Sequence, residues 1–321
     1  MDRNKSLVES GYLNVSNLHS IYYEIHGNKE GIPVFIVHGG PGGGSSYKNI
    51  KLFDLKKYKL VFFDQRGCGQ SIPRHELEEN NTDELIEDIE KLKQHLKLEK
   101  IILFGGSWGT TLSLLYAIKY PENVLQMILR AIFLARKKDV DFLYKKNGAS
   151  EFNPDYYKKF CEFVKLKNNQ DILQRYYEIL KDKNNGLRKE VAKVFSDWES
   201  SLASIGKYKP RKRLTEQQHN FNIDISLLEA HYFVNNSFLK ENNFILKNTK
   251  KIENIKTIIV HGRQDHICLP SGAFQLFSKL KNAKLFLVDK ASHSTWEKSI
   301  EKILKKEIQK ITNEINKERN E

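Results

Sequence analysis

The feature that most constrains this chain is one short turn, Gly105-Gly106-Ser107-Trp108-Gly109. It follows the apolar run at 101–104 and precedes a stretch at 110–120 with the composition of an apolar helix. The pattern Gly-x-Ser-x-Gly between a strand and a helix is typical of a tight turn that strains a serine and exposes its Oγ. We therefore predict that Ser107 is a nucleophile. The alternative is a glycine-rich turn that carries a structural serine.

Strand and helix patterns alternate on both sides of this turn. A hairpin is predicted at 10–26, a helix with Thr82 as its N-cap at 82–96, and buried strands at 33–37, 59–63, 126–130, 256–260 and 284–288. Continuous apolar strands between helices indicate a mostly parallel sheet with helices on both faces, the α/β class. Such sheets place their sites at the carboxyl ends of strands, where Ser107 lies.

The middle of the chain has a different character. From about 135 to 250 it has no buried strand pattern, and aromatic, lysine-rich helical stretches follow one another. We predict a core domain made of two segments, 1–134 and 251–321, and an inserted α-helical cap domain, 135–250.

Composition excludes several classes of protein. No apolar run reaches the roughly 20 residues that a membrane span needs, and the charged N-terminus does not resemble a secretory signal. The three cysteines form no Cys-x-x-Cys pair, so neither a disulfide framework nor a zinc site is expected, and a cytoplasmic location is predicted. The net charge is +13, but its lysines are scattered, so we expect no nucleic-acid partner. Nothing in the sequence indicates an oligomeric state.

A second glycine-rich loop follows the strand at 33–37, at 38–44. Its backbone can approach a substrate closely, and the N–H of Gly40 is expected to form an oxyanion hole with the N–H of Trp108. A phosphate-binding loop is the alternative. It is excluded because the loop lacks a Gly-Lys-Ser/Thr ending and Pro41 has no N–H. Asp64 and Arg66, which follow the next strand, are interpreted as structural.

A serine hydroxyl needs a general base, and the base needs an orienting carboxylate. Asp265 and His293 each follow a late strand, so they are expected at the same sheet edge as Ser107. The order Ser, Asp, His is that of α/β-hydrolases. Asp289 also follows a strand and is the alternative acid.

Several segments together resemble the proline iminopeptidases, or prolyl aminopeptidases, which are serine peptidases of the α/β-hydrolase superfamily. They are His38-Gly-Gly-Pro-Gly-Gly-Gly, Asp64-Gln-Arg-Gly-Cys-Gly, Gly105-Gly-Ser-Trp-Gly, Gly262-Arg-Gln-Asp and Ser292-His-Ser, with Asp197-Trp-Glu and Glu229-Ala-His-Tyr-Phe-Val-Asn in the cap. The likeness covers nearly the whole chain. Arg130-Ala131 replaces the family's usual Arg-Gly.

The resemblance implies release of N-terminal proline from peptides through an acyl-enzyme, with no metal or other cofactor. It also implies that Glu199 and Glu229 bind the charged imino group and that an apolar slot holds the proline ring, with Phe133 and Phe233 as candidates. Two alternatives stay open. One is an esterase or amidase of the same fold, and the other is a catalytically silent binding protein. A further hypothesis is that alkylation of Cys268, three residues from Asp265, crowds the site.

Overall fold

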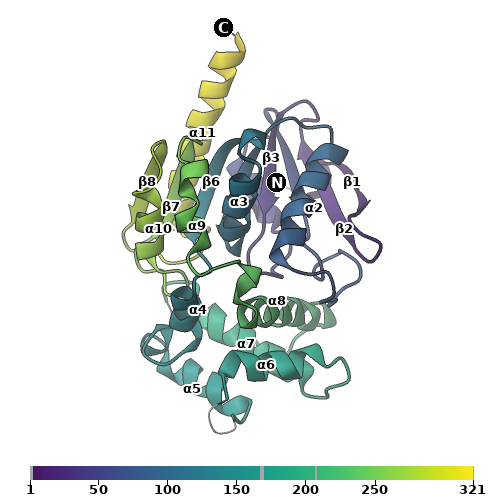
Figure 1. Ribbon diagram of the computed structural model, residues 1–321, viewed down its shortest axis with the longest axis vertical. Coiled ribbons are helices and arrows are strands. Elements are labelled where there is room, and N and C mark those ends of the chain that lie inside the picture. The colour runs from purple at the N-terminus through teal and green to yellow at the C-terminus, as the bar shows by residue number, and fades with distance from the viewer. Residues whose placement is uncertain (1–2, 167–169, 207, 321) are drawn as a thin grey trace.

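The computed structural model describes residues 3–166, 170–206 and 208–320, and an eight-stranded sheet forms its centre (Figure 1). The strand order is β1-β2-β4-β3-β5-β6-β7-β8. The first two strands pair antiparallel with each other, β2 pairs antiparallel with β4, and the other neighbours are parallel. The strands are β1 (Leu7–Asn14), β2 (Ser20–Gly27), β3 (Ile32–Val37), β4 (Tyr58–Phe63), β5 (Ile101–Ser107), β6 (Val124–Ile132), β7 (Thr257–Gly262) and β8 (Ala283–Val288).

Helices cover both faces of this sheet. Alternate residues of each buried strand point to opposite faces, so both faces carry apolar side chains that need to be covered. Phe35 and Leu103 belong to one apolar cluster, with α2 (Thr82–His95), α3 (Trp108–Lys119) and α10 (Pro270–Phe277). Val34 and Ile102 belong to the other, with the 3-10 helix η1 (Tyr47–Leu52) and α11 (Lys298–Asn320). The predicted α/β class is therefore confirmed.

The segment between β6 and β7 contains helices and, among its described residues, no strand. Its helices are α4 (Lys137–Tyr144), α5 (Pro154–Phe163), α6 (Ile172–Lys181), α7 (Arg188–Leu202), α8 (Glu216–Val234) and α9 (Phe244–Lys247). Helices α4 to α8 lie together below the sheet in Figure 1. Buried aromatic rings fill the space between them, and the rings of Phe160 and Tyr176 stack with centroids 4.5 Å apart. We keep the name cap for this group of helices, while the exact domain limits stay a prediction.

Asp224 on α8 ties the cap to the core. Its carboxylate accepts two hydrogen bonds from the Arg74 guanidinium, at 2.7 and 2.6 Å, and one from the backbone N–H of Gly69 at 3.1 Å. The glycine loop packs directly on the same helix turn, since a Cβ on Gly42 would lie 2.4 Å from the Asp224 carbonyl oxygen. Helix α8 is therefore fixed against the loop expected to line the active site.

The remaining elements are short or differ slightly from the predictions. They are α1 (Arg3–Ser6) and the 3-10 helices η2 (Pro121–Asn123), η3 (Ala149–Glu151), η4 (Asn236–Phe238) and η5 (Thr249–Lys251). The prediction of Thr82 as an N-cap was wrong: Asn81 caps α2, because its side chain accepts a hydrogen bond from the N–H of Glu84. The side-chain amide oxygen of Asn81, one residue before Thr82, accepts from a free N–H group at the start of the helix as well as a threonine hydroxyl would.

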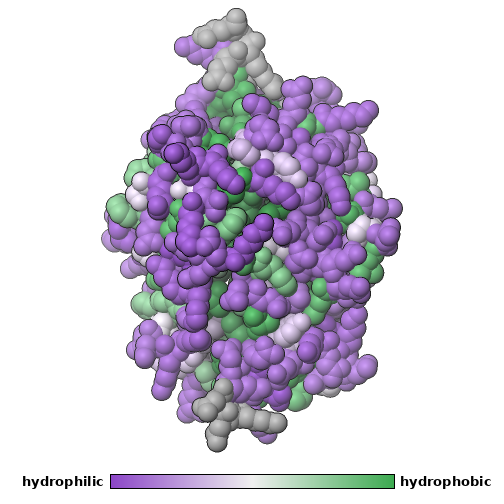
Figure 2. All heavy atoms as spheres, viewed as in Figure 1, coloured by the Kyte–Doolittle hydropathy of each residue, from purple (hydrophilic) through white to green (hydrophobic). Residues whose placement is uncertain are grey.

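The surface in Figure 2 is mostly hydrophilic, with apolar atoms in small separate groups. No helix of the described chain combines the length and the apolar character that a membrane crossing requires.

The turn around Ser107 gives a first prediction. A Cβ at Gly109 would lie 2.1 Å from the carbonyl oxygen of Val37 in β3, so Gly109→Ala must displace a buried strand. We expect a loss of about 2–3 kcal/mol or more in the free energy of unfolding, measured by denaturant titration. Gly186→Ala is the control, because a Cβ there meets nothing within 4 Å. Equal stability of the two variants would contradict this packing.

Candidate active site

Ser107 ends β5 and precedes α3 with φ of 57° and ψ of −128°. A non-glycine residue with positive φ is strained, and such strain persists only where neighbouring structure holds it. Glycines permit it here, since a Cβ at Gly105 would lie 2.5 Å from the Gly109 carbonyl oxygen. The Thr110 hydroxyl also donates to the Ser107 carbonyl oxygen at 2.8 Å. The side chain lines a cavity of about 390 Å³ between core and cap.

Asp265 and His293 meet at the same sheet edge, in the loops after β7 and β8. His293 Nδ1 donates to Asp265 Oδ2 at 2.9 Å, which leaves Nε2 as an acceptor. Asp265 is 2% exposed, and its Oδ1 accepts from the N–H groups of Ile267 and Cys268. Burial raises the pKa of Asp265, but His293, His261 and the Cys268 N–H outweigh it and bring that pKa to about 2. The carboxylate therefore stays ionised and orients the imidazole.

Asp289, the alternative acid, lies elsewhere. Its side chain is 77% exposed and pairs with Arg263 at 2.6 Å. Of these two acids, only Asp265 therefore lies beside His293.

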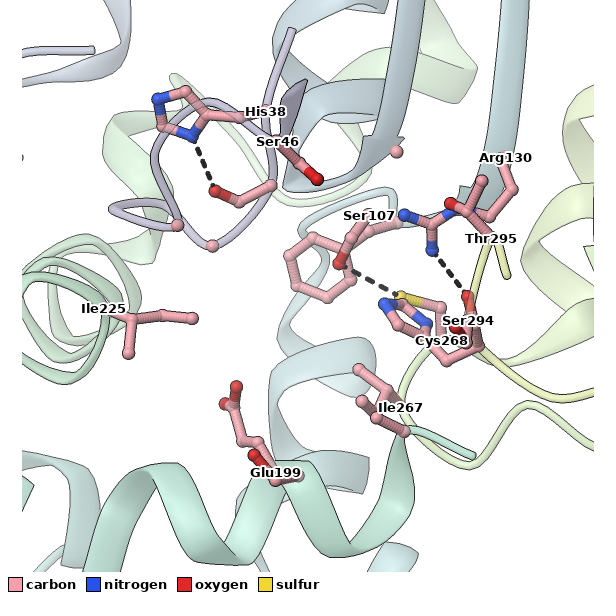
Figure 3. Close-up of a pocket in the computed structure, with 18 of the residues that line it drawn as sticks. His38, Ser46, Ser107, Arg130, Glu199, Ile225, Ile267, Cys268, Ser294 and Thr295 are labelled. Carbon is pink, nitrogen blue, oxygen red and sulfur yellow. Dashed lines mark hydrogen bonds between the residues drawn. The ribbon is translucent and has the colours of Figure 1, made fainter. Parts of the chain in front are cut away.

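Ser107 and His293 both line the cavity, but no hydrogen bond joins them within the described chain. Ser107 Oγ instead lies 3.9 Å from the sulfur of Cys268 (Figure 3). Burial raises the pKa of the Cys268 thiol well above its usual range, so the thiol stays protonated and is no competing nucleophile. Catalytic hydrogen bonds of free enzymes are often long and tighten only with substrate.

Arg130 supports the loop that carries His293. Its guanidinium donates to the His293 carbonyl oxygen at 2.7 Å, and Figure 3 shows this bond beside Ser107. A Cβ at Gly106 would lie 2.3 Å from Arg130 Nη2, so glycine at 106 makes room for the guanidinium.

A chain of hydrogen bonds holds the glycine loop against the turn. The Trp108 indole donates to Gln65 Oε1 at 3.1 Å, and the Gln65 amide donates to the His38 carbonyl oxygen at 2.9 Å. His38 Nε2 accepts from the Gln65 N–H at 3.0 Å, so its Nδ1 donates to the Gly39 carbonyl oxygen at 2.9 Å. Gly39 and Gly40 both line the cavity. The assignment of the Gly40 and Trp108 N–H groups to an oxyanion hole stays a prediction.

Asp64 and Arg66 lie in this supporting layer. Asp64 accepts from the backbone N–H groups of Ser45 and Gln70, and Arg66 pairs with Asp88 on α2 at 2.7 Å. Neither lines the cavity.

Glu199 on α7 and Glu229 on α8 face each other across the cap side of the cavity. The Tyr144 hydroxyl on α4 bridges them, with hydrogen bonds to Glu199 and, at 3.2 Å, to Glu229 Oε2. Burial raises the pKa of both carboxyls, and the charge of Glu199 raises that of Glu229 well above its usual range. The ionised form of the pair is therefore disfavoured, above all at Glu229. Two such oxygens close together form a site for a cation.

Phe133, which follows β6, and Phe233 on α8 form an apolar wall of the same cavity. Their ring centroids lie 5.6 Å apart in an edge-to-face arrangement. The cavity thus holds a strained serine, an imidazole, paired carboxyls and an apolar surface.

Comparison with known proteins gives the family. Residues 32–298 match the family described as the alpha/beta hydrolase fold. A probable proline iminopeptidase of Leptolyngbya boryana is 39% identical over 292 residues, which cover 91% of this chain and 90% of that protein. A proline iminopeptidase of Neisseria gonorrhoeae is 36% identical over 308 residues, with 96% and 97% covered. The chain belongs to the proline iminopeptidase family.

Solved structures agree on the fold. A haloalkane dehalogenase variant from Bradyrhizobium elkanii has a TM-score of 0.65 at 15% identity, with 95% of this chain and 98% of that chain covered. A bromoperoxidase from Bacillus anthracis has a TM-score of 0.61 at 19% identity, with 95% and 100% covered. At such low identity these likenesses show the α/β-hydrolase fold alone.

One group of side chains could hold a metal ion. Ligand atoms of Asp265, Cys268 and His293 lie within 4.8 Å of one another. Because Asp265 Oδ2 and His293 Nδ1 already bond to each other, an ion bound to those two atoms would break the pair that orients the imidazole.

The structure places seven of the nine predicted site residues on the cavity surface, and puts Asp265 and Trp108 directly behind it. The seven are Gly40, Ser107, Phe133, Glu199, Glu229, Phe233 and His293. Sequence reasoning missed Tyr144, which bridges the carboxyls, and Arg130, which holds the His293 loop. Tyr144 is one of 14 tyrosines, and no local pattern sets it apart.

The carboxyl pair gives a second prediction. Because the pKa of Glu229 is raised by folding, the folded chain holds a proton that the unfolded chain releases, so stability falls as pH rises above about 4.5. Glu229→Gln removes this ionisation. Its melting temperature relative to wild type should therefore increase from pH 5 to pH 8. The exposed Glu122→Gln should show no such trend, and a difference for Glu229→Gln independent of pH would contradict the buried pair.

Proposed function

We propose that this chain is a serine exopeptidase that releases N-terminal proline from peptides. The observation that carries the proposal is the carboxyl pair Glu199 and Glu229, which shares one cavity with Ser107 and His293. A proline at a peptide's amino terminus presents a charged secondary ammonium beside the carbonyl to be attacked. The site offers that cation two carboxylates and offers the ring the wall formed by Phe133 and Phe233.

Binding begins at the cap. The ammonium stabilises the ionised forms of Glu199 and Glu229, whose carboxyl protons pass to solvent, and it forms charge-assisted hydrogen bonds to both, so its own buried charge is neutralised. The Tyr144 hydroxyl continues to hold the two carboxylates in place. The pyrrolidine ring then packs on the apolar wall, and the carbonyl carbon faces Ser107.

The first chemical step forms an acyl-enzyme. Ser107 Oγ attacks the prolyl carbonyl carbon while His293 Nε2 takes the hydroxyl proton, and Asp265 stabilises the imidazolium. The N–H groups of Trp108 and Gly40 hold the oxyanion. His293 then gives the proton to the leaving amine, and the peptide bond breaks.

The second step releases proline. Water attacks the prolyl ester with His293 again as base, and the proton then returns to Ser107 Oγ as the ester bond breaks. No cofactor takes part in either step.

We also propose that the protein works in the cytoplasm on peptide substrates. Cys68, Cys161 and Cys268 are all free thiols, which suits a reducing compartment.

An esterase or amidase of the same fold is the alternative, and Glu229→Gln separates the two. Loss of one buried partner of an ammonium should lower kcat/KM for prolyl-aminomethylcoumarin by about 30-fold or more. Hydrolysis of 4-nitrophenyl acetate, which has no amine, should fall much less. Wild type should also reject N-acetylprolyl-aminomethylcoumarin. Equal losses on the amide and the ester would refute amine recognition.

A further inference from the structure

A second cavity, of about 630 Å³, opens between α7 and α8 beside the active site. Both cavities are lined by Glu199, Ser200 and Ile225, so they adjoin at these residues. Figure 3 shows Glu199 and Ile225 reaching from two different helices toward one open space. The volume is within the range of about 300–1,000 Å³ found for small-molecule sites.

Two cations on the segment between α7 and α8 line this second cavity: Lys209 and Arg211. Both are exposed, and neither forms an ion pair with any residue that the structure describes. The third cation of the lining, Lys193, is already neutralised by Asp197. The lining therefore contains two cations without an ion-pair partner among the described residues, and its two carboxyl residues, Asp197 and Glu199, are already bonded to Lys193 and Tyr144.

The segment that carries these cations is held at both ends. At one end the Tyr208 hydroxyl donates to Asp197 Oδ1 at 2.8 Å, and its carbonyl oxygen accepts from the Tyr156 hydroxyl at 3.2 Å. At the other end Thr215 caps α8 in a reciprocal pair of hydrogen bonds with Gln218. Lys209 and Arg211 lie between these anchors.

The amino end of α8 also faces the cavity. Gln217 and Gln218, in its first turn, line the cavity, and the amino end of a helix carries a partial positive charge. The acid of that turn, Glu216, lies outside the lining and pairs with Lys189. An anion in the cavity would meet this charge together with the two cations.

We propose that the second cavity is a subsite for the leaving part of the substrate, and that it binds a carboxylate there. This inference rests on the proposed function. With the ammonium at Glu199 and Glu229 and the carbonyl at Ser107, the peptide chain beyond proline must leave the first cavity. The two cavities adjoin at Glu199, Ser200 and Ile225, so a chain that passes these residues reaches the cavity lined by Lys209 and Arg211. The preferred substrates are then short peptides whose carboxylate lies a few residues after proline.

Four substrates test the subsite: Pro-Gly-Gly, its carboxyl-terminal amide, Pro-Gly-Glu-amide and prolyl-aminomethylcoumarin. Wild type should prefer Pro-Gly-Gly to its amide by about three- to tenfold in kcat/KM, and added salt should reduce the preference. A matching preference for Pro-Gly-Glu-amide would show that a side-chain carboxylate also binds. If Pro-Gly-Glu-amide shows no such preference, the subsite binds only the carboxylate at the end of the peptide chain.

The double variant Lys209→Ala/Arg211→Ala should lose that preference and keep wild-type activity on prolyl-aminomethylcoumarin. Lys212→Ala/Arg213→Ala is the matched control, because these exposed cations lie on the same segment outside the cavity lining. Absence of a carboxylate preference in wild type, or equal losses in both double variants, would overturn the subsite alone. Failure of wild type to hydrolyse the coumarin amide would overturn the proposed function, and the subsite with it.

Discussion

Two carboxylates buried side by side cannot both stay ionised unless a cation lies between them. Glu229 is 3% exposed and shares the Tyr144 hydroxyl with Glu199, so burial and the charge of Glu199 raise the pKa of Glu229 well above its usual range. An ammonium ion between the two carboxyls would stabilise their ionised forms, whereas a neutral amide would not. We propose that discrimination for a free amino terminus follows from this burial and charge. It also requires the cap to hold the pair at a fixed place above Ser107, which Asp224 achieves by tying α8 to Arg74.

The core brings Ser107, Asp265 and His293 together through the geometry of its mostly parallel sheet. Parallel strands bring their carboxyl ends to one edge, so residues separated by more than 150 positions, Ser107 and Asp265, come to the same site. The strain at Ser107 is supported by close backbone packing, in which Gly109 approaches the Val37 carbonyl oxygen. In the proposed mechanism, the residues at the sheet edge supply the reactive groups, and the helices that cover this edge select the substrate. Both sets of residues line the cavity between core and cap.

The sequence predicted the fold class and the family, because strand periodicity and the motif segments are local signals. It also named residues that the structure brings to one cavity, although their catalytic roles stay predictions. What it missed depends on contacts between distant parts of the chain. Tyr144 reaches Glu199, 55 positions away, and Asp224 reaches Arg74, 150 positions away. The contact of Ser107 with Cys268, in place of a bond to His293, is likewise set by loop packing that no spacing pattern encodes.

The most direct test of the link between nucleophile and amine site is labelling by a fluorophosphonate, read by peptide mass spectrometry. We expect the label on Ser107, and we expect prolinamide to slow labelling, because its ammonium binds Glu199 and Glu229 and its carbonyl group then lies against the serine. N-acetylprolinamide should give no protection, and Ser107→Ala should take up no label. A label at another residue, or equal protection by both amides, would contradict a serine peptidase that selects a free amino terminus.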